Sequence, residues 1–182
     1  MKVGLYGGTF DPIHNGHLHV INALITQKLV DKLLVVPAGN PRLRDHQPKA
    51  TGAQRRQMCQ LAVNSLSDDV KKSVEVNPIE ILRDGPSYTI DTVEAVAATY
   101  PGATIILIVG TDAYEKIDQW HRADELKQMV EFLIIDRPNF PGAANLQIDA
   151  LKVSATEIRE RKSDAVPAAV AAFIKENNLY AS

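Results

Sequence analysis

The feature that most constrains the fold is an alternation between short apolar runs and longer segments with helical spacing. Apolar runs of strand length occupy residues 3–6, 33–36, 105–109 and 132–135. Between them, apolar residues recur three or four positions apart, as they do at Leu18, Ile21, Ile25 and Leu29. This β-α-β-α order predicts an α/β fold, a Rossmann-like doubly wound parallel sheet with helices on both faces. We expect a single domain over residues 1–182.

Weaker local signals predict the remaining elements. Residues 74–81 predict another strand, which Pro78 should confine to an edge or a bulge. Thr51 and Gln54 predict a capping box, and Ser87 or Thr89 is the expected N-cap of a later helix. Residues 151–153 predict one more short strand.

Composition excludes several classes of protein. The 182 residues carry a net charge of −2, whereas a dedicated nucleic-acid binder normally has a strongly basic face. One cysteine, Cys59, excludes a disulfide framework, and its apolar helical surroundings favour a core residue over a nucleophile. Without an apolar run of about 18 residues, we expect a cytoplasmic protein that binds neither membrane nor nucleic acid. The sequence leaves a homo-oligomer open.

A glycine- and histidine-rich segment directly follows the first predicted strand. It runs over residues 7–17 as GGTFDPIHNGH and matches neither the dinucleotide-binding fingerprint nor the P-loop. Its glycines suit close approach of a ligand to the backbone, and the helix that begins near Gly16 directs N–H groups toward an anion. His14 and His17 add ring N–H donors, so the segment predicts a triphosphate site. A zinc site is less favoured, since the spacing lacks i, i+4 and no third ligand is near.

A second candidate for phosphate binding lies near the C-terminus. Residues 153–159 read VSATEIR, which supplies hydroxyls, helix-start N–H groups and a guanidinium. Alone, this pattern is equally typical of a well-capped helix. Paired with the first segment, it could close the other side of the same phosphates.

These segments resemble the two signature motifs of the nucleotidylyltransferase superfamily. Residues 85–92 (GPSYTIDT), residues 110–112 (GTD) and the pair Trp120-His121 are similar to the bacterial nicotinate-nucleotide adenylyltransferase family. The similarity runs from Lys2 to Tyr180. It implies transfer of AMP from ATP to nicotinate mononucleotide, giving deamido-NAD and pyrophosphate by in-line attack of the mononucleotide phosphate on the α-phosphorus.

The resemblance also implies roles for individual residues. His14, His17 and Arg159 would be catalytic. ATP would contact Gly7, Gly8, Thr9, Phe10, His14, Gly16, His17, Gly110, Asp112, Ser154, Thr156 and Arg159. The mononucleotide would contact Tyr88, Thr89, Trp120, Asp112 and Arg44. Mg²⁺ would arrive with the phosphates of ATP, and we expect no dedicated metal ligands from protein.

Two departures and several alternatives stay open. Where the family has a Pro-Pro-His-Lys core, this chain has residues 41–44 as PRLR, so Arg42 or Arg44 either meets a phosphate or belongs to a solvated basic loop. The stretch between Arg161 and Pro167 is several residues shorter than the family leads us to expect. Trp120 could instead be a core residue. The alternative functions are another small nucleotidylyltransferase, such as phosphopantetheine adenylyltransferase, and a non-catalytic nucleotide-sensing module.

Overall fold

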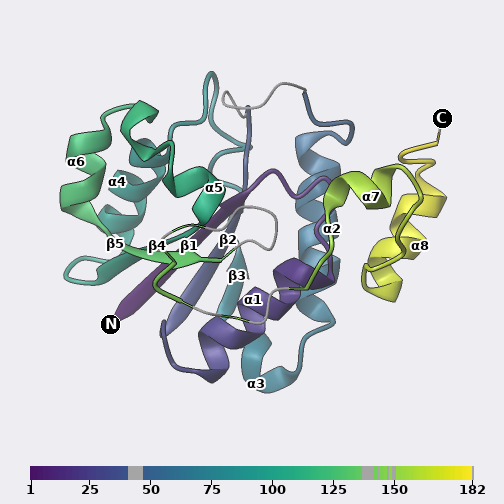
Figure 1. Cartoon of the computed structure of the whole chain (residues 1–182), viewed down its shortest axis with the longest axis horizontal. Helices are drawn as coiled ribbons and strands as arrows, with labels where there is room; N and C mark the ends of the chain where they lie inside the picture. The colour runs from purple at the N-terminus through teal and green to yellow at the C-terminus, as the bar shows by residue number, and fades with distance from the viewer. Residues whose placement is uncertain (41–46, 137–141, 143, 147, 149–150, 182) are drawn as a thin grey trace.

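The sheet is formed by five parallel strands in the order β3-β2-β1-β4-β5. The structure is a computed structural model that describes residues 1–40, 47–136, 142, 144–146, 148 and 151–181 (Figure 1). The strands are β1 (Lys2–Gly8), β2 (Lys32–Pro37), β3 (Val74–Val76), β4 (Thr104–Gly110) and β5 (Glu131–Ile135). Because β2 and β4 flank β1 on opposite sides, the chain reverses its direction of growth at β1.

Helices cover both faces of this sheet, as the sequence predicts. The first face carries α1 (Asn15–Thr26), α2 (Gly52–Asn64) and α3 (Asp68–Lys71), and α8 (Ala168–Glu176) packs against α2. The second carries α4 (Thr89–Thr99), the 3₁₀ helix η1 (Ile117–Gln119) and α6 (Ala123–Met129). Two further helices are short. α5 (Thr111–Tyr114) directly follows β4, and α7 (Ala155–Arg159) precedes α8. The Rossmann-like α/β fold class is therefore confirmed.

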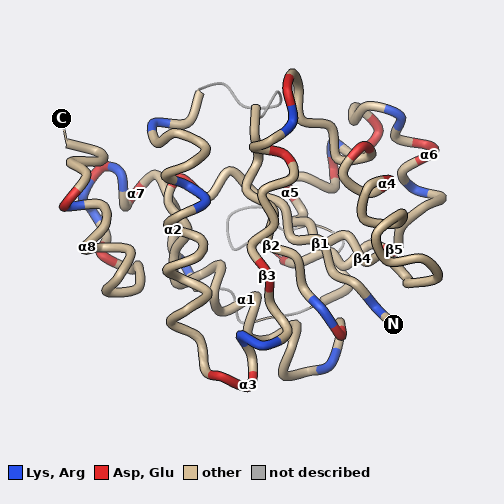
Figure 2. The backbone as a smooth tube through the Cα atoms, turned by 180° about the vertical axis from the view of Figure 1, so that it is seen from behind, with Lys and Arg blue, Asp and Glu red and all other residues tan. Residues whose placement is uncertain are grey.

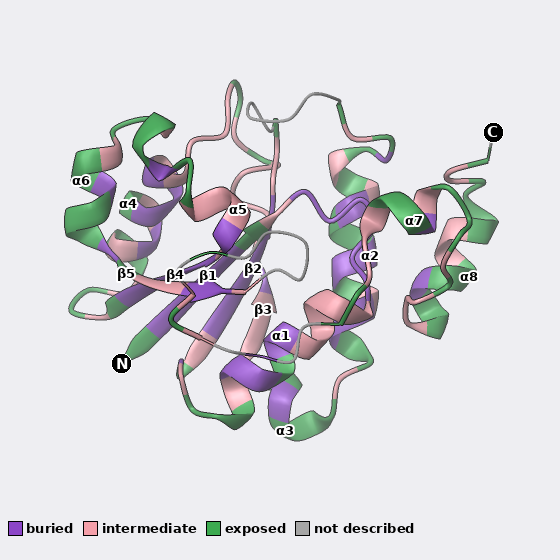
Figure 3. Cartoon of the chain, in the orientation of Figure 1, coloured by how far each residue is buried: buried purple, intermediate pink, exposed green. Residues whose placement is uncertain are grey.

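The alternating side chains of the strands build two separate cores. On β2, Leu33 and Val35 join the cluster under α1 and α2, whereas Leu34 and Val36 join the cluster under α4 and α6. Figure 3 shows the buried residues concentrated along the central strands and the inward faces of the helices. Cys59 is one of them, which confirms the predicted core residue, and burial raises the pKa of its thiol.

Three local predictions are wrong in detail. The strand predicted over residues 74–81 ends at Val76, because Pro78 has no N–H for a ladder; its edge position is as predicted. Residues 151–153 form no strand. The N-cap of α4 is Tyr88, without a side-chain cap, while Thr89 is already helical. The capping box at Thr51 is confirmed, since Thr51 Oγ1 accepts from Gln54 N at 3.2 Å.

Charge is distributed evenly over the described surface. Figure 2 shows Lys and Arg interspersed with Asp and Glu around the periphery of the fold. This pattern agrees with the net charge of −2. None of the helices in the described part of the chain is both long and apolar enough to cross a membrane.

Candidate functional site

The two predicted phosphate motifs meet at the edge of the sheet where its strands end. β1 leads into the segment of residues 7–17, and Arg159 of α7 reaches it from the other end of the chain, because Arg159 Nη1 donates to the carbonyl of Asp11 at 2.8 Å. We call residues 7–17 together with residues 154–159 the glycine–histidine cluster. It lies beside the point where the strand order reverses, which is where open parallel sheets bind ligands.

His14 and His17 lie against each other at the start of α1. Their rings stack at 3.7 Å between centroids, and the backbone N–H of His14 donates to His17 Nδ1 at 3.2 Å. An accepting Nδ1 places the ring proton of His17 on Nε2. His14 is only 5% exposed, so its ring is shielded from solvent. Phe10 packs edge-on against His17 at 5.0 Å and orients its ring further.

The loop between these histidines and β1 is held by a buried carboxylate. Asp11 is 4% exposed, and its side chain accepts hydrogen bonds from the N–H groups of Lys49 at 2.8 Å and Ala50 at 3.1 Å. Phe10 has φ of 50°, a left-handed conformation that is costly for a bulky residue and persists only when its surroundings fix it. Asp11 supplies much of that fixation, although we did not single it out from the sequence.

A buried arginine ties this loop to the start of α2. Arg55 is 1% exposed, and it donates to the carbonyls of Thr9 at 2.8 Å, Gly39 at 3.3 Å and Ala50 at 3.3 Å. The sequence analysis missed Arg55, yet a signal was present. Arg55 falls on the same helical stripe as Met58, Cys59 and Ala62, so a charged residue occupies an otherwise apolar face.

Ser154 and Thr156 organise the first turn of α7. Ser154 Oγ accepts from Glu157 N at 3.2 Å, and Glu157 accepts in return from Ser154 N at 3.0 Å, which makes a capping box. Thr156 Oγ1 accepts from Arg159 Nη2 at 3.1 Å. With Asp11 bound to its other terminal nitrogen, the planar guanidinium is fixed in orientation. Residues 154–159 thus form a well-capped helix and also contact the first motif, so both interpretations of this segment hold together.

Gly7, Gly8 and Gly16 meet different surroundings. A Cβ at Gly7 would meet nothing within 4 Å among the described atoms, so its exposed backbone can be approached closely. A Cβ at Gly8 would come within 2.8 Å of the Phe10 ring, and one at Gly16 within 3.0 Å of His14. These two glycines are therefore required by packing around the loop.

A second group of predicted residues meets on the other face of the sheet. Tyr88 stacks on His121 at 4.2 Å between ring centroids and 28° between planes, so the loop before α4 and the loop after η1 lie together. We call residues 85–92 with Trp120 and His121 the tyrosine–tryptophan cluster. Trp120 is half-buried and packs against the second core cluster, so the core interpretation holds in part.

This second cluster is anchored to the loop after β2 by Ser87. The N–H of Asn40 donates to Ser87 Oγ at 3.0 Å, which explains why Ser87 does not cap α4. Glu80 accepts from Thr92 Oγ1 at 3.0 Å and also from the N–H of Gly39 and the hydroxyl of Ser87. Burial raises the pKa of Glu80, against the opposing effect of these hydrogen bonds.

The other predicted residues lie as follows. Gly110 ends β4 and is the N-cap of α5, and Asp112 lies in the first turn of that helix, half-buried. They therefore stand at the carboxyl end of the strand next to β1. Arg42 and Arg44 lie outside the described residues. No group of three His, Cys, Asp or Glu side chains able to hold a metal occurs among the residues that are described.

Comparison with known proteins shows that the chain belongs to the nucleotidyltransferases. The cytidylyltransferase-like family model matches residues 5–161. A probable nicotinate-nucleotide adenylyltransferase of Bacillus pumilus is 35% identical over 100% of this chain and 99% of its own length. The nicotinate-nucleotide adenylyltransferase of Bacillus subtilis is 33% identical, with the same coverage. The chain belongs to the nicotinate-nucleotide adenylyltransferase family.

Solved structures agree on the fold. A nicotinic acid mononucleotide adenylyltransferase of Plasmodium falciparum, complexed with NaAD, superimposes with a TM-score of 0.84 at 21% identity, covering 98% of this chain and 97% of that one. A second structure of that enzyme, complexed with APC, gives a TM-score of 0.80 at 20% identity. At this level of identity the likeness concerns the fold.

Proposed function

We propose that the glycine–histidine cluster binds the triphosphate of ATP and that the tyrosine–tryptophan cluster binds nicotinate mononucleotide. The chain is an enzyme that transfers the AMP moiety of ATP to nicotinate mononucleotide, which yields deamido-NAD and pyrophosphate. The observation that carries the placement is the 2.8 Å bond between Arg159 and the Asp11 carbonyl. It joins two phosphate-binding motifs from opposite ends of the chain beside β1.

The chemistry requires no nucleophile from the protein, because the mononucleotide phosphate is already ionised. Its oxygen attacks the α-phosphorus of ATP, and the bond to the bridging oxygen breaks as pyrophosphate leaves. His17 Nε2–H and the Arg159 guanidinium are donors that stabilise charge developing on the phosphate oxygens. His14, Ser154, Thr156 and the backbone of Gly7–Phe10 and Gly16 position the triphosphate, and Gly110 and Asp112 face a ribose.

On the other side, the indole of Trp120 stacks on the pyridine ring, and Tyr88 and Thr89 present helix-start N–H groups to its carboxylate. We also propose Arg44 as a contact to the mononucleotide phosphate. Mg²⁺ would be held by the substrate phosphates, and it would neutralise part of their charge. The described residues suit that arrangement, because the cluster near the phosphates offers imidazole and guanidinium donors.

Selection of the acid over the amide follows from the donors around Thr89. A carboxylate only accepts hydrogen bonds, whereas a carboxamide would turn an N–H₂ toward donors or leave one unpaired, which costs about 1–3 kcal/mol. Within residues 85–89 no side chain is acidic, and Asp84 is exposed. We therefore expect kcat/KM to be at least about tenfold higher for nicotinate than for nicotinamide mononucleotide.

One assay tests both the reaction and the substrate. Pyrophosphate release from Mg·ATP is measured with nicotinate mononucleotide, nicotinamide mononucleotide and 4′-phosphopantetheine as acceptors, and the dinucleotide is identified by mass. Turnover with the acid mononucleotide above the other two supports the proposal. Equal or higher turnover with the amide contradicts the specificity, release only with 4′-phosphopantetheine supports that alternative, and ATP binding without release supports a sensing module.

A further inference from the structure

The C-terminal arm of the chain contacts residues 11–15 of the glycine–histidine cluster at three points. We define the C-terminal arm as residues 154–181, which include α7 and α8 and lie along α2 at the edge of the molecule away from α4 and α6 (Figure 1). Besides the bond from Arg159 to Asp11, the N–H of Asn15 donates to the Ala165 carbonyl at 2.9 Å. The third contact is a hydrogen bond from Tyr180 Oη to Asp11 Oδ1 at 2.7 Å.

The contact at Ala165 lies in the stretch between Arg161 and Pro167. Asn15 is the first residue of α1, so its N–H has no acceptor within the helix. The Ala165 carbonyl satisfies that donor and thereby ties the arm to the start of α1.

The Tyr180 contact has a direct route to the site. Asp11 is a nearly fully buried carboxylate, and such a group is stable only when its oxygens are well hydrogen-bonded. Tyr180 adds an O–H donor to the two N–H donors from Lys49 and Ala50. Asp11 in turn holds the backbone beside Phe10, whose left-handed φ sets the direction of the loop toward His14.

We propose that Tyr180 is a positioning residue for ATP: through Asp11, it fixes the loop that binds the triphosphate, without touching the nucleotide itself. Burial, aided by the hydrogen bond to Asp11 and its charge, raises the pKa of the Tyr180 phenol. The phenol therefore keeps its proton and remains a donor over the working range of pH. The proposal rests on the ATP site given above under proposed function.

The C-terminal arm should affect the binding of ATP far more than the binding of the mononucleotide. Among the described residues, the hydrogen bonds between the arm and the rest of the chain end on residues 11–15, in the layer of α1 and α2. The tyrosine–tryptophan cluster is built from α4, η1 and the second core cluster, on the opposite face of the sheet. Loss of the phenol hydroxyl should therefore weaken the binding of ATP and leave the binding of the mononucleotide nearly unchanged.

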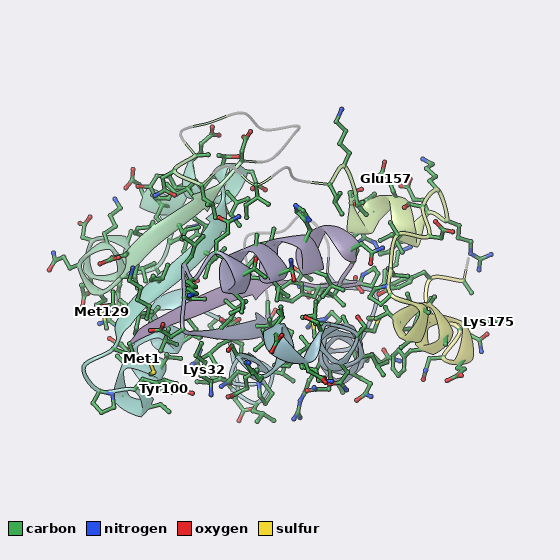
Figure 4. All side chains as sticks on the ribbon, turned by 90° about the horizontal axis from the view of Figure 1, so that it is seen from below. Met1, Lys32, Tyr100, Met129, Glu157 and Lys175 are labelled. Atoms are coloured by element: carbon green, nitrogen blue, oxygen red, sulfur yellow. The ribbon has the colours of Figure 1, made fainter. Side chains whose placement is uncertain are left out.

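The test compares Tyr180→Phe with Tyr100→Phe. The control also removes one phenol hydroxyl. Lys32 Nζ lies 5.3 Å from the centroid of the Tyr100 ring, and Figure 4 shows Tyr100 and Lys32 at the end of the molecule opposite Glu157 of α7. For Tyr180→Phe we expect the Kd of a non-hydrolysable ATP analogue, measured by calorimetry, to rise about tenfold, as for a lost hydrogen bond to a charged group. KM for ATP should rise by a similar factor. KM for nicotinate mononucleotide should stay within about twofold of wild type, because the indirect effects of a substitution are roughly of that size.

A double-mutant cycle separates positioning from general loss of stability. In an Asp11→Asn background, Tyr180→Phe should change ATP affinity by much less than in the wild-type background, since the partner carboxylate is gone. An unchanged Kd for the analogue in Tyr180→Phe overturns the proposal, and so does equal weakening of both substrates with a lowered Tm. Failure of the wild-type chain to bind the analogue would instead overturn the proposed ATP site.

Discussion

The glycine–histidine cluster and the tyrosine–tryptophan cluster, which we propose to bind the two substrates, are held in place by different contacts. The first is fixed by buried groups: Asp11, Arg55 and His14 are each 5% exposed or less, and the partners of Asp11 and Arg55 come from distant parts of the chain. In the second, the residues proposed to contact the mononucleotide are less buried, since Tyr88, Thr89 and Trp120 are all half-buried. Tyr88 and His121 stack near the surface, and Arg122 beside them forms exposed ion pairs with Glu94 and Glu125, both at 2.7 Å.

This difference matches what each substrate requires. In-line phosphoryl transfer depends on fixed geometry around the reacting phosphorus, so preorganised donors held by buried contacts contribute most there. A flat pyridine ring is recognised by stacking and by a few donors at its edge, which tolerates a more exposed site. We therefore expect substitutions in the first cluster to affect kcat or stability, and substitutions in the second to affect mononucleotide affinity.

The largest effect is expected from His17→Ala. The variant removes one donor to the charge that develops in the transition state, which typically costs about 2.7–4 kcal/mol, or roughly 10²–10³ in kcat. Steady-state pyrophosphate release measures it, with circular dichroism to verify the fold. His19→Ala is the matched control on the same helix, and turnover of His17→Ala within a few-fold of that control would contradict the assigned role.

Arg55→Met should be the next largest and should act on stability. It leaves the carbonyls of Thr9, Gly39 and Ala50 without their buried donor, and an unsatisfied buried polar group costs about 1–3 kcal/mol. We expect the free energy of unfolding in urea to fall by about 3 kcal/mol in total. Arg56→Met, at the exposed neighbouring position, should change the free energy of unfolding by less than about 0.5 kcal/mol. Equal effects at the two positions would contradict a stabilising role for the three hydrogen bonds of Arg55.

Trp120→Ala tests the other side of the comparison. Stacking on a base is worth about 1–3 kcal/mol by alanine substitution, so KM for the mononucleotide should rise while KM for ATP changes little. Tyr100→Ala is the control, because Tyr100 also packs half-buried against the second core cluster but lies at the opposite end of the sheet. If Trp120→Ala lowers the Tm as Tyr100→Ala does and leaves KM unchanged, Trp120 is a core residue only.

Sequence reasoning succeeded where one segment carries its own information. The order of strands and helices follows from apolar periodicity, and residues 7–17 contain the glycines and histidines that the cluster uses. It failed where a distant partner decides the outcome. Ser87 does not cap α4 because Asn40, 47 positions away, uses its hydroxyl. Tyr180 meets Asp11 across 169 positions, a contact that no local pattern indicates.

The smallest effect concerns the carboxylate that joins the two loops beside the tyrosine–tryptophan cluster. Because burial raises the pKa of Glu80 in the folded state, the folded chain holds this proton more tightly than the unfolded chain does. Its contribution to stability is therefore fully present below the ordinary carboxyl pKa of 4.5 and is lost as pH rises through the folded value. Glu80→Gln has no proton to lose and retains an oxygen acceptor for Thr92 and Gly39.

The free energies of unfolding of Glu80→Gln and of the wild type are measured in urea from pH 4 to pH 8. Relative to the wild type, the variant should thus become more stable as pH rises. Glu160→Gln provides a control of opposite sign, since the hydrogen bond from Lys162 lowers the pKa of Glu160 and the variant should lose on the wild type over the same rise. A Glu80→Gln difference that is flat with pH, or that follows the sign of Glu160→Gln, would show that Glu80 is held as a paired surface carboxylate. No carboxylate beside the second cluster would then have its pKa raised by burial, and the contrast with the buried Asp11 of the first cluster would be sharper.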